Sequence, residues 1–123
     1  MNTLRNADVA QMTAAATEFL AAQPWCGRVV SVVPVFVLAG DVGAFRCSLI
    51  PSQPNADVMV WVVVGDLPSA YLVHEPGDSW QDAFAAYVTE LSRWENDERL
   101  ASRLEFIRTR LVDVDPDSVV SDV

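Results

Sequence analysis

The stretch Val58-Met59-Val60-Trp61-Val62-Val63-Val64 decides the fold, because it is an unbroken apolar run rich in β-branched residues. Successive side chains of a strand point to opposite faces, so a run without polar alternation predicts a strand that is covered on both faces. Such a strand lies at the centre of a sheet. Trp61 and Val63 are expected to share one face, and the opposite face is expected to hold Val60, Val62 and Val64.

The apolar run ends in Gly65-Asp66-Leu67-Pro68, which predicts a tight turn before a short strand at residues 70–73. Glycine adopts backbone angles that are closed to other residues, and proline presets φ. We expect the Asp66 carboxylate to accept hydrogen bonds from nearby backbone N–H groups. Gly65, Asp66 and Pro68 are therefore interpreted as structural residues of this turn.

The N-terminal segment predicts a helix that ends near Ala22 and is capped by Asn6 or Asp8. Its apolar stripe has helical spacing. The stripe consists of Val9, Met12, Ala16, Phe19 and Leu20.

Two further strands are expected before the central one. Residues 28–38 are β-rich but contain Pro34, which cannot donate to a ladder, so this strand is at an edge, bulged or split there. Residues 39–43 predict a hairpin connection. Residues 45–50 alternate, with Phe45, Cys47 and Leu49 on one face and Arg46 and Ser48 on the other.

The C-terminal third is expected to be helical. Ser79 and Asp82 have the spacing of a capping box at the start of the first helix. An aromatic stripe follows at helical spacing and is expected to pack on the sheet, with a pocket between this helix and the sheet as the alternative. The stripe consists of Trp80, Phe84, Tyr87, Leu91 and Trp94. A last helix is expected after Asn96 or Asp97, with an apolar stripe from Leu100 to Leu111.

These elements predict an α+β fold, with an antiparallel four-stranded meander sheet, one N-terminal helix and two C-terminal helices in the order α-β-β-β-β-α-α. Residues 1–112 are expected to form a single domain, and residues 113–123 an acidic, frayed tail. With 123 residues, of which 51% are hydrophobic, the chain is long enough to bury a core. The sequence shows no export signal or membrane span, so we expect a cytoplasmic protein whose Cys26 and Cys47 are free thiols.

The charge is strongly acidic, with 17 Asp and Glu against 8 Arg and Lys and a net charge of −9. A nucleic-acid-binding surface needs the opposite sign, so nucleic acid is excluded as a partner. From Asp78 onward the chain has 11 acids and 5 arginines, a net of −6, against −3 for the first 77 residues. This asymmetry can steer a basic partner to one side of the molecule, although a solvated acidic surface is the simpler reading.

Catalytic and metal-binding patterns are weak. The only histidine, His74, precedes Glu75, but adjacent strand residues point to opposite faces. Nucleophilic candidates such as Cys47 and Ser69 would have only His74 as a base. One histidine and two separated cysteines have no metal-ligand spacing, and no glycine-rich phosphate loop precedes a helix. We therefore expect no enzyme activity, no metal and no cofactor.

The segment from Trp61 through Gly65-Asp66-Leu67-Pro68 to Tyr71, with the aromatic helix behind it, resembles a family of small uncharacterised bacterial proteins. That family carries a Trp-rich strand that leads into Gly-Asp-Leu-Pro-x-x-Tyr and a helix with a late tryptophan. The resemblance covers Val58 to Trp94. It implies an α+β fold and brings no catalytic residue with it.

The function that the sequence favours is non-catalytic binding. The leading hypothesis is a small acidic immunity protein that neutralises a bacterial toxin by covering its basic active site. The alternatives are a homodimer with a housekeeping or regulatory role, and a small enzyme or ligand-binding protein. The expected partner-binding acids, on or near the C-terminal helices, are Glu75, Asp78, Asp82, Glu90, Glu95, Asp97 and Glu98. Tyr71 and Trp94 are the candidate aromatic anchors of that surface.

Overall fold

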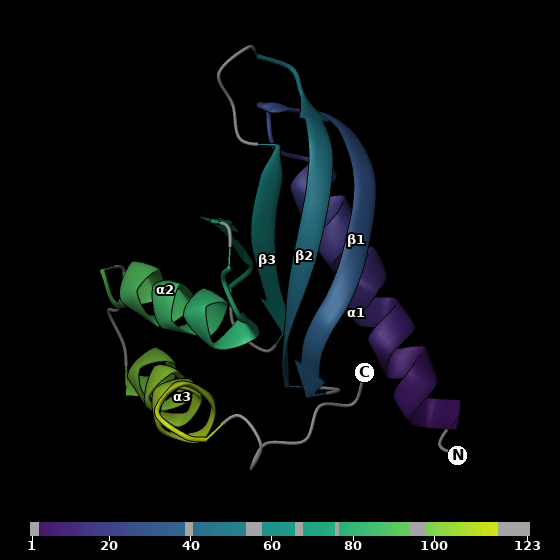
Figure 1. Ribbon diagram of the computed structural model, residues 1–123. Helices are drawn as coiled ribbons and strands as arrows, with labels where there is room; N and C mark the ends of the chain where they lie inside the picture. Colours follow the sequence, from purple (N-terminus) through teal and green to yellow (C-terminus); the bar gives the residue numbers. More distant parts are fainter. Residues whose placement is uncertain are drawn as a thin grey trace.

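The computed structural model describes residues 3–38, 41–53, 58–65, 68–75, 77–93 and 98–115. The predicted α+β order is confirmed, with the elements α1 (Thr3–Ala21), β1 (Cys26–Leu38), β2 (Val42–Pro51), β3 (Met59–Gly65), β4 (Ala70–Val73), α2 (Trp80–Ser92) and α3 (Glu98–Ile107). The strands form one antiparallel meander in the order β1-β2-β3-β4. Figure 1 shows α1 along one face of the sheet and α2 and α3 on the other.

The central strand β3 is buried on both faces over residues 60–64, as its composition predicts, while Met59 at its start is half-buried. Val60, Val62 and Val64 join the core under α1. Trp61 and Val63 join the second core, which α2 and α3 cover. The sheet thus separates two apolar cores, and each helical layer closes one of them.

The α1 core contains the predicted stripe of the first helix. Ala16 and Leu20 are fully buried, and Val9, Met12 and Phe19 pack around them. The predicted caps are wrong, because α1 begins at Thr3 and residues 6 and 8 lie inside it. No glycine or proline precedes Asn6, so nothing in the backbone stops the helix there, and a cap contributes only about 1 kcal/mol.

Strand β1 is an edge strand with an irregular register, as Pro34 predicts. Its pairing with β2 shifts at three places, one of which lies between Pro34 and Phe36. The shift lets Phe36 turn into the α2 core, while Val37 faces the α1 core. Strand β2 begins at Val42, earlier than predicted, because pairing with β3 extends as far as Gly65.

Helix α2 begins with the predicted capping box. Ser79 accepts from the backbone N–H of Asp82, and the Asp82 carboxylate accepts from the backbone N–H of Ser79. The ring of Trp80 stacks on Phe36 at a centroid distance of 4.1 Å. Phe84, Tyr87 and Leu91 are buried against the sheet, whereas Trp94 lies outside the described residues.

The last helix is shorter than its apolar stripe predicts. α3 ends at Ile107 and continues as a wider π-helical turn, η1 (Arg108–Val112), in which the backbone N–H of Asp113 donates to the carbonyl oxygen of Arg108. The side chain of Gln81 in α2 donates at 2.9 Å to the carbonyl oxygens of Leu111 and Val114. These bonds tie the end of η1 to α2. Asn96 and Asp97, the predicted caps of this helix, lie outside the described residues.

The turn after β3 is described only at its two ends. Gly65 has a φ of +154°, in a region that glycine alone adopts readily, and its Cα lies against the backbone of Asp41. The carbonyl oxygen of Pro68 accepts a 2.7 Å hydrogen bond from the hydroxyl of Tyr87. Asp66, with its predicted backbone bonds, lies outside the described residues.

Candidate partner-binding surface

Strand β4 is the second edge of the sheet, and its outer side is open. It pairs only with β3 among the described strands. The outer edge of such a strand presents backbone N–H and C=O groups that have no ladder partner. Tyr71 and Val73 are 44% and 59% exposed, although both are large apolar side chains. The strand contains no charged residue or proline, the usual devices that keep an edge from pairing with another chain.

A groove of about 470 Å³ follows this edge. Its floor is β4, one wall includes Phe19 of α1, and the opposite wall includes Glu90 and Leu91 of α2. Tyr71 is held in place by ring contacts with Phe19 at 6.4 Å and with Trp25 at 4.8 Å. The exposed edge is therefore flanked by ordered apolar side chains on both faces of the sheet.

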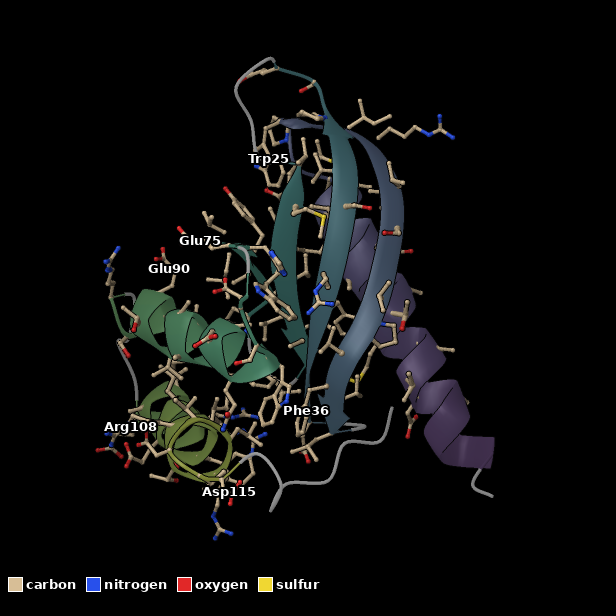
Figure 2. The ribbon with its side chains drawn as sticks, viewed as in Figure 1. Trp25, Phe36, Glu75, Glu90, Arg108 and Asp115 are labelled. Atoms are coloured by element: carbon tan, nitrogen blue, oxygen red, sulfur yellow. The ribbon has the colours of Figure 1, made fainter. Side chains whose placement is uncertain are left out.

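Acidic side chains border this groove. The carboxylate of Glu90 pairs with Arg93 at 3.5 Å, and both side chains are well exposed. A surface pair of this kind contributes at most about 1 kcal/mol and is readily exchanged for another partner. Glu75 lies two residues beyond the end of β4 and is exposed. Figure 2 shows Glu75 and Glu90 on the side of the molecule where α2 extends past the sheet.

Of the other predicted partner-binding acids, Asp78 lies beside Glu75, whereas Asp82 and Glu98 are placed elsewhere on the C-terminal helices. Asp78 accepts from the backbone N–H of Glu75, and Asp82 is used in the cap of α2. Glu98 is exposed at the start of α3, and Glu95 and Asp97 lie outside the described residues. Within the described part of 77–115 these acids are interspersed with arginines. The arginines are Arg93, Arg99, Arg103, Arg108 and Arg110.

His74 has a partner that its sequence neighbourhood does not suggest. Its imidazole lies 5.1 Å from the ring of Trp61, nearly parallel to it, and its Nε2 accepts a 3.2 Å hydrogen bond from Nε of Arg46. The guanidinium of Arg46 in turn lies over the Trp61 ring, 5.2 Å from its centroid. His74 and Glu75 both follow the end of β4, so the alternation expected of strand side chains does not apply to them.

Of the candidate nucleophiles, Cys47 is enclosed in the fold, whereas Ser69 is exposed just before β4. Cys47 is fully buried. Burial, and to a smaller extent the electrostatic interaction with Cys26, raises the pKa of its thiol to about 12. Burial also raises the pKa of Tyr87, whose hydroxyl is bonded to Pro68. Among the described residues no three His, Cys, Asp or Glu side chains are placed to hold a metal ion.

The raised pKa of Cys47 predicts a loss of stability at alkaline pH. The unfolded thiol ionises near its ordinary value of 9.0, whereas the folded thiol resists ionisation up to about 12. The contribution of this thiol to stability is therefore complete below pH 9 and declines above it, by up to about 1.4 kcal/mol per pH unit. Urea unfolding at pH 8, 9 and 10 measures the decline. The free energy of unfolding of the Cys47→Ala variant should fall less steeply between pH 8 and pH 10. Equal slopes for the variant and the unchanged protein would contradict the assignment of the decline to Cys47.

Neither the family models nor the curated proteins nor the solved structures with which the chain was compared contain a match. The resemblance of Val58 to Trp94 to a small bacterial family stays a resemblance. None of the helices in the described ranges has the length and apolarity needed to cross a membrane.

Proposed function

We propose that this chain is a non-catalytic binding protein that captures a basic protein partner along the outer edge of β4. The observation that carries the proposal is the exposed edge, where Tyr71 and Val73 lie in a groove between two helices. An extended segment of a partner can add to such an edge through main-chain hydrogen bonds, and its alternate side chains then enter the flanking apolar pockets.

Charge selects the kind of partner. The net charge of −9 attracts basic proteins at long range. Glu90 supplies negative charge in the wall of the groove, and Glu75 is an exposed acid two residues beyond β4. The role that we favour is neutralisation of a bacterial toxin in the cytoplasm, by covering its basic active site. Tyr71 is the anchor in this proposal, because aromatic residues that are held in place contribute most at interfaces.

The absence of catalysis in the proposal is supported by how the reactive groups are used. His74 is bonded to Arg46, and Cys47 is buried with a raised pKa. The aromatic stripe of α2 fills its space against the sheet, since Phe84 and Tyr87 are buried. Two hollows lie beside α1, one of about 260 Å³ and one of about 470 Å³, and the second is the β4 groove described above.

The test is protection of cells that co-express the cognate toxin. A variant with Glu75→Lys and Glu90→Lys should lose protection, because two reversed charges at the rim slow association about tenfold. Tyr71→Lys should lose it as well, since a lysine on an edge strand opposes strand addition. The matched control carries Glu105→Lys and Asp113→Lys, the same change in charge on exposed positions away from β4. Full protection by folded groove variants would contradict the proposal.

A homodimer with a housekeeping or regulatory role is the second candidate, and the same edge favours it. Two β4 strands can pair across a twofold axis and extend the sheet. The net charge of each chain opposes this association. Sedimentation at several protein concentrations and at high salt separates the candidates, because salt would screen the repulsion and strengthen a homodimer but weaken capture of a basic partner.

A further inference from the structure

Part of one sheet face has none of the described helices over it. α2 and α3 lie across one end of the sheet, over Phe36, Ala44 and Val63, and Figure 1 shows none of the described helices over the other end of β1–β3 on this side. The register places the uncovered side chains in cross-strand rows, because Arg46 pairs with Val33 and Trp61, and Ser48 pairs with Ser31 and Met59. We name this area the open sheet surface, which consists of Ser31, Val33, Arg46, Ser48, Ile50 and Met59.

Arg46 is the charged centre of this surface. Its Nε is held by His74 and its guanidinium is supported by Trp61, so the side chain is fixed in direction. Within the described ranges no carboxylate lies within 4.0 Å of it. Its two terminal nitrogens thus present a fork of N–H donors without a protein acceptor in those ranges.

Two more groups on this surface are polar and have hydrogen-bond donors that are not used within the described residues. The hydroxyls of Ser31 and Ser48 bond to each other at 2.6 Å, which uses one hydroxyl hydrogen and leaves the other free to donate. This pair lies one row along the strand from Arg46, about 7 Å away by strand geometry. Nε1 of Trp61, the ring under Arg46, is buried and has no hydrogen-bond partner among the described residues. Buried indole N–H groups usually have one.

Apolar side chains lie on the same surface beside these polar groups. Val33 and Ile50 are 48% and 54% exposed, and Met59 is half-buried. A cation that is fixed among apolar side chains on an open surface matches an acidic side chain carried on an apolar protein segment. We propose that the open sheet surface binds such a segment, with a Glu or Asp carboxylate held bidentately by Arg46.

Two other occupants are less favourable by charge. A phosphate group carries nearly two charges, and the net charge of −9 repels it more strongly than a carboxylate. A second copy of the chain would bring two such net charges together. This site is distinct from the β4 groove, so it does not depend on the proposed function, and one partner with both a basic and an acidic segment could occupy both.

The experiment observes Arg46 directly by NMR of the ¹⁵N-labelled full chain. The Nε–Hε signal of Arg46 is assigned by its loss in Arg46→Lys. The probes are N-acetyl-Leu-Glu-Leu-amide, its Gln analogue, and methyl phosphate. The glutamyl peptide should shift this signal saturably and bind about tenfold more tightly than the Gln analogue, because hydrogen bonds to a charged acceptor are stronger.

Variants separate recognition from folding. Arg46→Lys keeps the charge and loses the fork, so it should bind the glutamyl peptide about tenfold more weakly, as followed by the indole signal of Trp61. Arg108→Lys, a change on an exposed arginine paired with Glu105, is the matched control and should bind normally. If Arg46→Lys does not fold, Ser48→Ala tests the same surface and should weaken binding about threefold.

Four results would overturn the proposal. Equal binding of the Glu and Gln peptides would remove the carboxylate from it. Tighter binding of methyl phosphate would assign the fork to phosphate. An Arg46 shift that grows with the concentration of the protein alone would assign the surface to a second copy. No response to any probe would leave Arg46 as a cover for Trp61.

Discussion

Replacement of Gly65 by alanine should lower the free energy of unfolding by about 4 kcal/mol. A Cβ at this position would overlap the carbonyl oxygen of Asp41 and would lie 2.7 Å from the Cα of Val42, both of which are backbone atoms. The φ of +154° adds strain for any residue with a side chain. Relief of the overlap would require β2 and β3 to separate where Val42 pairs with Gly65.

Gly77→Ala is the matched control for this prediction. Gly77 also has a positive φ, +89°, but nothing lies within 4 Å of its added Cβ. It should therefore cost only about 1 kcal/mol, from the backbone alone. Urea unfolding followed by tryptophan fluorescence gives both values. If the two variants differed by less than 1 kcal/mol, the close approach at Gly65 would be relieved cheaply and the prediction would be wrong.

Trp61→Ala should also cost about 4 kcal/mol, because it leaves a cavity at the centre of the α2 core. Trp61 is 1% exposed and is among the largest buried side chains. It pairs across the sheet with Arg46 and Leu72, and its ring supports both Arg46 and His74. The variant thus removes the packing of the core and the support of the open sheet surface together.

Trp61→Phe separates ring volume from the indole N–H. Because Nε1 has no hydrogen-bond partner among the described residues, its removal breaks no bond within them, and the phenyl ring keeps most of the packing. A loss of about 1.5 kcal/mol is expected. A loss as large as that of Trp61→Ala, measured by the same urea unfolding, would mean that Nε1 makes an essential polar contact.

The sequence predicts the fold where a residue's burial follows from local pattern. The run at 58–64 has no polar alternation, and the structure buries residues 60–64 of it on both faces, whereas Val58 is exposed and Met59 half-buried. Pro34 marks the edge strand because a missing N–H is a local property. The end of α3 could not be predicted in this way. Its change to a π-helical turn accompanies bonds from Gln81, which lies 30 residues before Leu111.

The candidate sites were less predictable for a related reason. The acids of the C-terminal third were visible as a charge asymmetry, but whether each is exposed, capping or paired depends on tertiary contacts. Arg46, Trp61 and His74 meet only once the register of three strands is fixed. The alternation of residues 45–50 did place Arg46 away from the α1 core. The alternation did not indicate that the described helices would leave that part of the sheet uncovered.

The division into two cores has a consequence for synthesis on the ribosome. The core under α1 consists only of residues that precede α2 in the chain, so it can close before α2 and α3 have left the ribosome. During that interval the opposite face presents Phe36, Trp61 and Val63 to solvent, until α2 and α3 arrive to cover it. During that interval this apolar face is the part of the nascent chain through which aggregation would proceed.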